Sequence, residues 1–162
     1  MLDPAQFRHR VIRPALLKLG LHSPAAEALL LGTALTESGL VHLVQTGGGP
    51  ALGPYQVEPA THTDIWLSYL AFRPARAARV ALLAAGLRPS AAQLVWNLGY
   101  ATAIARLVYY RAPEPLPAAH DIGALAAYWK AHFNTGAGKG DPRDFIARAG
   151  PHLHDPGARR RP

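Results

Sequence analysis

The sequence predicts a mainly helical single domain, and three observations support this prediction. The chain has 162 residues, which suits one domain with a core of its own. Its hydrophobic fraction is 49%, much of it Ala and Leu, which favour helices over sheets. Segments with helical spacing of apolar residues alternate with Pro- and Gly-rich connections. With no internal repeat in the sequence, we expect one domain over residues 1–150 and a frayed basic tail over residues 151–162.

The first half of the chain is expected to contain four helices and one long loop. Gly20 is a natural stop for the first helix, and Ser23-Pro24 is a good cap and first-turn pair for the second. Residues 40–54 contain four glycines, which predicts a long ordered loop or a short hairpin, and such loops are usually functional. The expected helices run from Pro4 to Leu19, from Pro24 to Glu37, from near Pro59 through Leu70, and from Pro74 to Gly86.

The second half is expected to contain three more helices. Ser90 is predicted to cap the longest helix of the chain, which would carry both Asn97 and Val108. A stiff connector with three prolines follows over residues 112–117. The later elements are a helix from Asp121 to near Phe133, a Gly-rich loop from Asn134 to Gly140, and a short helix that starts at Asp141-Pro142.

Composition limits the classes of function. The chain has no cysteine, which excludes disulfides and thiolate metal sites, and its eight histidines lack metal-ligand spacing, so we expect no metal and no cofactor. A net charge of +7 favours anionic partners such as the bacterial cell wall, nucleic acid or anionic lipid, although part of it lies in Arg159–Arg161. No apolar run reaches the roughly 18 residues of a membrane span, and the first twenty residues lack the layout of a signal peptide.

Glu37 is the strongest candidate for a catalytic residue. Leu30, Thr33, Ala34 and Glu37 follow the i, i+3, i+4, i+7 spacing of one helix face. A carboxyl group that points inward from such a stripe is desolvated, which raises its pKa and suits it to act as a general acid. The alternative is a glutamate that turns to solvent, because helix ends commonly carry charge.

Four short elements carry a resemblance to a known family. Glu37-Ser38 is followed by Gly53-Pro54-Tyr55-Gln56-Val57 and then by Pro59-Ala60-Thr61; further on come Asn97-Leu98 and His132-Phe133-Asn134-Thr135-Gly136-Ala137-Gly138. In this order and spacing, over residues 24–140, they resemble the soluble lytic transglycosylases, the wider goose-type lysozymes and small phage-encoded wall-degrading proteins. The chain departs from that pattern where Tyr55 and Glu58 replace Met, Ala101 replaces Gly and Phe133 replaces Tyr.

The resemblance implies a lysozyme-like domain that cleaves peptidoglycan without a cofactor. Glu37 would protonate the oxygen of the β-1,4 bond between N-acetylmuramic acid and N-acetylglucosamine. The substrate's acetamido group or 6-hydroxyl would then attack, with Glu37 as the base and no second carboxylate. The loop beside Glu37 would border the cleft, where Gln56 lies beside the reacting sugar and Asn97 and Asn134 bind its acetamido group or hold the loops that do. The residues expected to bind substrate are Ser38, Tyr55, Gln56, Asn97, Tyr100, Tyr128, Phe133 and Asn134.

Phe133 is the residue that supports the first alternative function. In many relatives a Tyr hydroxyl at this place orients the catalytic Glu, and Phe cannot donate that hydrogen bond. Either Tyr128, Tyr100 or Tyr55 substitutes for it, or activity is reduced. A degenerate lysozyme-like virion protein, or one that binds glycan without cutting it, is therefore an alternative.

Charged residues allow a different mechanism and a different function. Glu58 or Asp64 could act as a second carboxylate in a hydrolytic, inverting reaction. The net positive charge is also compatible with a small helical protein that binds nucleic acid. The basic residues of the domain are, however, spread over separate helices, which argues against this function. We therefore expect a monomer whose partner is peptidoglycan, with no obligatory nucleic acid. It would act at the bacterial wall, in the periplasm or carried in a virion, and its product, a hydrolysed or a 1,6-anhydro sugar, stays open.

Overall fold

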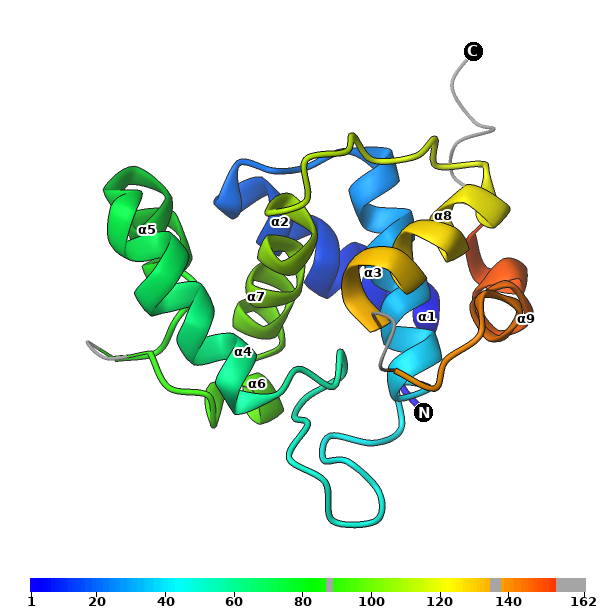
Figure 1. Ribbon diagram of the computed structural model, residues 1–162, viewed down its shortest axis with the longest axis horizontal. Helices are drawn as coiled ribbons and strands as arrows, with labels where there is room; N and C mark the ends of the chain where they lie inside the picture. Colours follow the sequence, from blue (N-terminus) through cyan, green and yellow to red (C-terminus); the bar gives the residue numbers. More distant parts are fainter. Residues whose placement is uncertain (87–88, 135–137, 154–162) are drawn as a thin grey trace.

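The protein is mainly helical (Figure 1). The computed structural model describes residues 1–86, 89–134 and 138–153. Within these ranges there is no β-strand, and two isolated antiparallel bridges join Leu52 to Val44 and to Val57. The predicted mainly helical class is confirmed.

The described residues contain helical elements of three kinds. Elements labelled η are π-helical turns, except η3, which is a 3₁₀ turn. In chain order they are α1 (Pro4–Phe7), η1 (Arg8–Ile12), α2 (Arg13–Leu19), α3 (Pro24–Glu37), α4 (Pro59–Asp64), η2 (Ile65–Tyr69), η3 (Leu70–Phe72), α5 (Pro74–Ala81), α6 (Gln93–Trp96), α7 (Leu98–Tyr110), α8 (Ile122–Trp129), η4 (Lys130–Asn134) and α9 (Pro142–Leu153).

The first two predicted helices are confirmed, with the expected ends. Elements α1, η1 and α2 form one continuous helical segment from Pro4, and Gly20 ends it with a φ of 72°. Ser23 caps α3, because its side chain accepts a hydrogen bond from the backbone N–H of Ala26 at 3.0 Å. The α3 segment then runs uninterrupted to Glu37.

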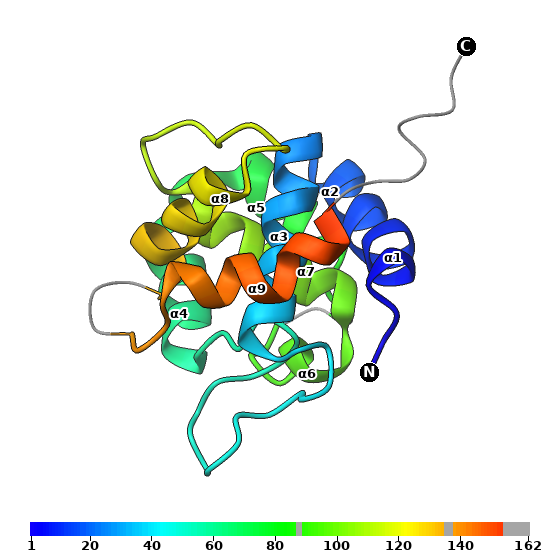
Figure 2. The same ribbon diagram turned by 90° about the vertical axis from the view of Figure 1, so that its right-hand side faces the viewer.

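Helix α3 forms the centre of the molecule. Every residue from Ala26 to Leu35 is buried, because this part of the helix is covered by neighbours on all sides. Figure 2 shows α9 crossing it on one side, and α1, α7 and α8 also contact it. Its last residue, Glu37, lies just beyond this buried stretch.

A buried ion cluster joins the first helical segment to α3. Glu27 of α3 is 1% exposed. It accepts hydrogen bonds from Arg8 at 2.9 Å and from Arg13 at 2.6 Å, and His22 lies 2.6 Å from it. Burial by itself would raise the pKa of Glu27, but the hydrogen bonds from Arg13, Arg8 and His22 outweigh it and lower the pKa to about 2.

The structure corrects four expectations about helix ends. Ser90 does not cap a helix, because α6 begins at Gln93 and has no side-chain cap. The helix expected from Pro74 to Gly86 ends at Ala81. The helix expected from Ser90 through Val108 is interrupted at Asn97, whose side chain caps α7 by accepting from the N–H of Tyr100 and also donates to the Leu83 carbonyl. Fraying from Pro151 is also wrong for the residues up to Leu153, which continue α9. The carbonyl of Leu153 accepts a hydrogen bond from Arg8 at 3.2 Å.

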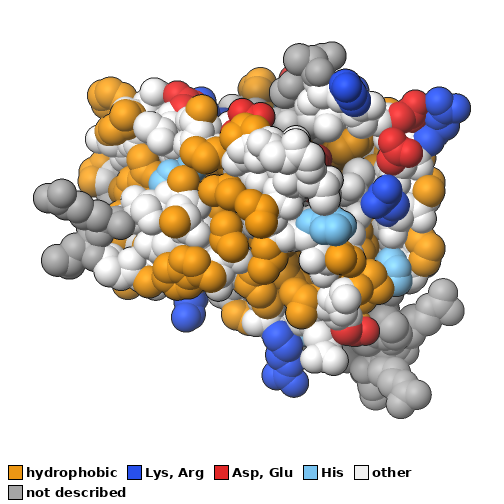
Figure 3. All heavy atoms as spheres, turned by 90° about the horizontal axis from the view of Figure 1, so that it is seen from below, with side chains coloured by type: hydrophobic (Ala, Val, Ile, Leu, Met, Phe, Trp, Pro, Cys, Tyr) orange, Lys and Arg blue, Asp and Glu red, His pale blue; other side chains and the backbone are white. Residues whose placement is uncertain are grey.

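Some expected features lie outside the described residues. The arginines Arg159–Arg161 belong to residues 154–162, and part of the expected Gly-rich loop falls on residues 135–137. The loop from Ser38 to Glu58 is described in full and lies at the lower edge of Figure 1. The face seen from below presents mostly hydrophobic and uncharged side chains, with acidic and basic ones scattered among them (Figure 3). Val41, Leu43 and Val44 of the loop are among the exposed hydrophobic residues.

Candidate active site

Glu37, the last residue of α3, lines a groove of about 670 Å³. The groove lies between the loop that follows α3, the start of α4, the end of α7 and the turn η4. Its lining residues include Gln45, Gln56, Glu58, Thr61, Val108, Phe133 and Asn134. Residues from both halves of the chain therefore meet around the carboxyl group of Glu37.

Two opposing effects act on this carboxyl group. Burial raises the pKa of Glu37, and a hydrogen bond from the indole Nε1 of Trp129 to Oε1, at 2.9 Å, offsets part of that rise. The net result is a pKa above the ordinary value of 4.5. A carboxyl group that keeps its proton to higher pH and borders a groove can donate that proton to a bound ligand.

Trp129 is the partner of Glu37 that the sequence did not predict. It is the last residue of α8, is 1% exposed and packs against the ring of Phe145, with 5.8 Å between ring centroids. Gly140 approaches the same indole so closely that an added Cβ would overlap it. Trp129 lies four residues before Phe133 on one continuous helical segment, and this spacing was the available signal.

Phe133 lies in the groove with a tyrosine behind it. The ring of Tyr109 is 5.2 Å from that of Phe133, and its hydroxyl lies 2.6 Å from the hydroxyl of Thr33, one turn before Glu37. Tyr109 is fully buried, and burial raises its pKa well above the usual value. The groove is therefore backed by a buried aromatic layer.

The tyrosines expected to replace the missing hydroxyl are engaged elsewhere. Tyr55, 1% exposed, lies 3.0 Å from the Thr102 hydroxyl. The Tyr100 hydroxyl accepts from the indole of Trp66 and also pairs with His62. Tyr128 donates to the Glu114 carbonyl at 2.8 Å. The group that donates to Glu37 is the Trp129 indole instead, and none of the three tyrosines lines the groove among the described residues.

The polar residues predicted to bind substrate divide into two groups. Gln56 and Asn134 line the groove. Gln56 has a positive φ of 49° and donates to the Gly53 carbonyl, and Asn134 accepts from Lys130 at 2.8 Å. Ser38 and Asn97 do not line it: Ser38 is buried and donates to the Pro54 carbonyl at 2.7 Å, and Asn97 caps α7. Ser38 thus fastens the loop beside Glu37 rather than facing the groove.

Of the two candidates for a second carboxylate, one lines the groove and the other does not. Glu58 is exposed and lines the groove. Asp64 lies outside it and forms an ion pair with Arg111 at 2.7 Å, and that hydrogen bond lowers its pKa. Within the described ranges, no group of three or more His, Cys, Asp or Glu side chains is arranged to hold a metal ion.

Comparison with known proteins adds no relative. No known protein family, no curated protein and no solved structure gives a significant match to this chain. In the part of the chain that the structure describes, no helix combines the length and hydrophobicity that crossing a membrane requires.

Proposed function

We propose that the protein is a peptidoglycan-cleaving glycosidase in which Glu37 is the general acid and base. The observation that carries this proposal is the half-buried Glu37 carboxyl, with its raised pKa, at the wall of a groove of about 670 Å³. The substrate and the lysozyme-like assignment of the fold come from the motif resemblance. Three of the motif segments contribute to the lining of the groove, through Glu37, through Gln56 with Val57, and through Phe133 with Asn134.

The proposed mechanism needs one carboxyl group in two protonation states. Protonated Glu37 donates to the glycosidic oxygen, and the C–O bond to the anomeric carbon of N-acetylmuramic acid breaks. The carboxylate that results then accepts a proton from the attacking group, which is the 6-hydroxyl for a 1,6-anhydro product or water for a hydrolysed one. The indole N–H of Trp129 stabilises the carboxylate formed between these steps, because a hydrogen bond to the charged form favours it.

Glu58 supports a second version of the same function. It is the other carboxylate among the described residues that line the groove, so it could activate water in an inverting hydrolysis. A Glu58→Gln variant with unchanged products and rate would favour the single-carboxylate route.

The test is the identity of the products from purified peptidoglycan, measured by mass spectrometry. Muropeptides that end in 1,6-anhydromuramic acid would identify a lytic transglycosylase. Products with a reducing N-acetylmuramic acid would identify a lysozyme. If several wall types yield no products, the proposal is wrong, and binding to the insoluble wall without cleavage would favour a protein that binds glycan without cutting it.

A further inference from the structure

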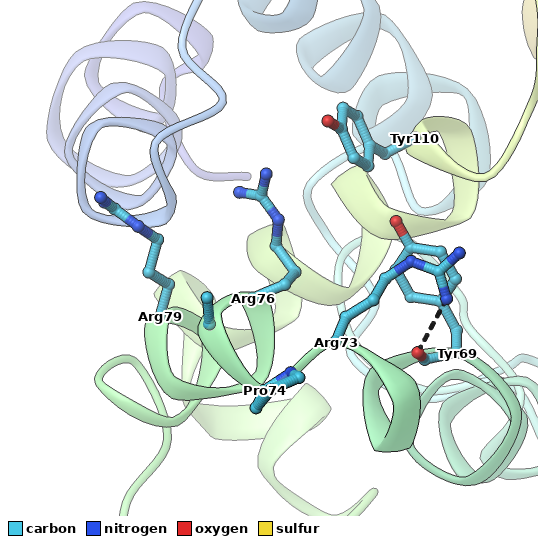
Figure 4. Close-up of a pocket in the computed structure, with 7 residues that line it drawn as sticks. Tyr69, Arg73, Pro74, Arg76, Arg79 and Tyr110 are labelled. Atoms are coloured by element: carbon cyan, nitrogen blue, oxygen red, sulfur yellow. Dashed lines mark hydrogen bonds between the residues drawn. The ribbon is translucent and has the colours of Figure 1, made fainter.

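A second pocket lies on the side of the molecule formed by α5 (Figure 4). Its volume is about 370 Å³, and its lining residues include Tyr69, Arg73, Arg76, Arg79 and Tyr110. Among the described residues none lines both this pocket and the groove of Glu37. We call it the arginine pocket.

Two arginines of the pocket are held in place by backbone carbonyls and by aromatic rings. Arg73 donates to the carbonyl of Tyr69 at 3.1 Å, and its guanidinium lies 4.0 Å from the centroid of that ring. Arg76 donates to the carbonyl of Leu19 at 2.8 Å and lies 5.1 Å from the ring of Tyr110. Each guanidinium has five N–H donors, so these contacts fix its position and leave donors for a ligand.

Arg79 completes the set and links α5 to the end of α2. It donates to the carbonyl of Lys18 at 3.4 Å. Arg76 and Arg79 lie three residues apart on α5, and Arg73 is the residue just before the helix. Figure 4 shows the three side chains rising on the same side of this segment. The three guanidinium groups therefore share one face of the molecule.

The charge of this pocket is not neutralised by acidic side chains. In the described ranges, no carboxylate lies within ion-pair distance of Arg73, Arg76 or Arg79, whereas Arg8 is paired with Glu27 and Arg111 with Asp64. The pocket also has no acidic residue in its described lining.

Arg106 adds a further positive charge behind the pocket. It is 6% exposed, its guanidinium lies 5.3 Å from the ring of Tyr110, and its Nε and Nη1 atoms have no hydrogen-bond partner within the described residues. A buried cation without a counter-ion is costly, and a bound anion close by would offset part of that cost.

We propose that the arginine pocket binds a phosphate group of a phosphodiester-linked polymer carried by the bacterial wall. Guanidinium groups recognise phosphate oxygens through paired N–H donors, and three of them line this pocket with no competing carboxylate. Each of the two tyrosine rings lies beside a guanidinium, so the rings help to position the arginines. The choice of a wall polymer over a nucleic acid rests on the proposed function, and the pocket would hold the protein on the wall while the groove engages glycan.

The first experiment locates binding with inorganic phosphate as the probe. Arginine Nε–Hε NMR signals are followed while phosphate is added at constant ionic strength, with chloride as the matched titration. We expect saturable shifts at Arg73, Arg76 and Arg79 with phosphate alone. Linear shifts, or equal shifts with chloride, would overturn the proposal, and neither result depends on whether the protein cleaves glycan.

The second experiment identifies the polymer. Binding of a poly(glycerol phosphate) chain is measured for the wild type and for the Arg73→Gln/Arg79→Gln variant. The matched control, Arg10→Gln/Arg148→Gln, removes the same two charges from exposed positions outside the arginine pocket. Loss of the pocket arginines is expected to weaken binding about tenfold or more, and the control change to weaken it about twofold.

Three outcomes of this experiment would overturn the proposal. Equal losses in the pocket variant and the control would mean that net charge alone drives binding. Unchanged binding in the pocket variant would place the site elsewhere. Equally tight, equally pocket-dependent binding of single-stranded DNA of the same charge would reject the wall polymer as the specific partner. Unfolding of each variant by urea verifies that a loss of binding is not a loss of fold.

Discussion

At the scale of single residues, the chemistry of the groove depends on how Glu37 and Trp129 act on one another. Burial favours the neutral carboxyl group, and the indole N–H favours the carboxylate. A general acid that must also serve as a base needs both states within reach near the working pH. The indole therefore sets how far burial can raise the pKa of Glu37.

The first prediction concerns Trp129→Phe, which removes the donor and keeps an apolar ring. Because the lost hydrogen bond lowers the pKa of Glu37, we expect this pKa to rise further, and the acid step, which leaves Glu37 as a carboxylate, to slow. The ¹³C NMR titration of the Glu37 carboxyl and the pH profile of glycan cleavage measure both effects. Trp66→Phe is the matched control, since that indole donates to Tyr100 outside the groove. An unchanged titration of Glu37 in Trp129→Phe would contradict this account.

The sequence predicted Glu37 and missed Trp129 for a physical reason. The apolar stripe around Glu37 is local, since Leu30, Thr33 and Ala34 lie within two turns of it, and all three are buried as expected. Trp129 is 92 residues away, so its contact with Glu37 depends on how α8 packs against α3. Five residues expected to bind substrate are absent from the described lining of the groove. Each is engaged by a contact with a segment distant in sequence, which local spacing cannot predict. They are Ser38, Tyr55, Asn97, Tyr100 and Tyr128.

At the scale of elements, the ion cluster around Glu27 makes the junction between the first helical segment and α3 sensitive to acid. The pKa of Glu27 is about 2 in the folded protein and near 4.5 in a model peptide. A group whose pKa is lowered by folding stabilises the fold above its unfolded pKa, and this stabilisation is lost as the pH falls through the folded pKa.

The second prediction concerns this loss of stability at low pH. Between about pH 5 and about pH 2 the free energy of unfolding should fall by on the order of 3 kcal/mol through Glu27 alone. Urea unfolding at several pH values measures it. Glu27→Gln should be less stable near pH 7, because it leaves Arg8 buried beside a neutral partner, and should show a shallower pH dependence. An equally steep dependence in the variant would contradict the assignment to Glu27.

The third prediction concerns the crossing of α3 and α9. A Cβ on Gly32 would overlap the ring of Phe145, so Gly32→Ala should destabilise the protein by about 1–3 kcal/mol, although Ala favours helices. Gly123→Ala is the matched control: its Cβ would meet only the Asp121 carboxylate at 3.6 Å, so it should be neutral or slightly stabilising. Chemical denaturation compares the two, and equal stabilities would contradict the close packing at Gly32.

Several helix starts and stops were predictable from local caps, although Ser90, which was also expected to cap a helix, does not cap one. Ser23-Pro24 and Asp121 start helices, and Gly20 ends one, as expected. The break at Asn97 was missed because Leu94, Asn97, Ala101 and Val108 keep a helical spacing across it. The side chain of Asn97 donates a hydrogen bond to the carbonyl of Leu83, which belongs to another segment. The spacing of apolar residues cannot predict such a contact.

At the scale of the whole molecule, the net charge of +7 is not spread evenly. Arg8 and Arg13 share an ion pair with the single carboxylate of Glu27, while the arginine pocket has no carboxylate in its described lining. The groove contains two glutamates and borders a loop that exposes Val41, Leu43 and Val44. One side of the protein is therefore suited to attract anions, and another to hold a largely uncharged glycan.

The fourth prediction is that retention on an anionic wall depends on salt. Raising sodium chloride from about 0.05 M to about 0.5 M shortens the Debye length from about 14 Å to about 4 Å, so co-sedimentation with walls that carry phosphate polymers should weaken. Walls stripped of those polymers by acid treatment are the control, and retention on them should change little. Equal salt dependence on both wall preparations would show that charge attraction does not involve the phosphate polymers.

The rate of glycan cleavage by Glu37→Gln tests the central claim most directly. The amide has the same shape as the carboxyl group but can neither donate an acidic proton nor act as a base, so the rate should fall by about 10²–10⁴-fold or more, while binding to glycan persists. Glu58→Gln, at the other groove carboxylate, is measured beside it. A Glu37→Gln variant that cleaves peptidoglycan within about tenfold of the wild-type rate would show that Glu37 is not the catalytic acid.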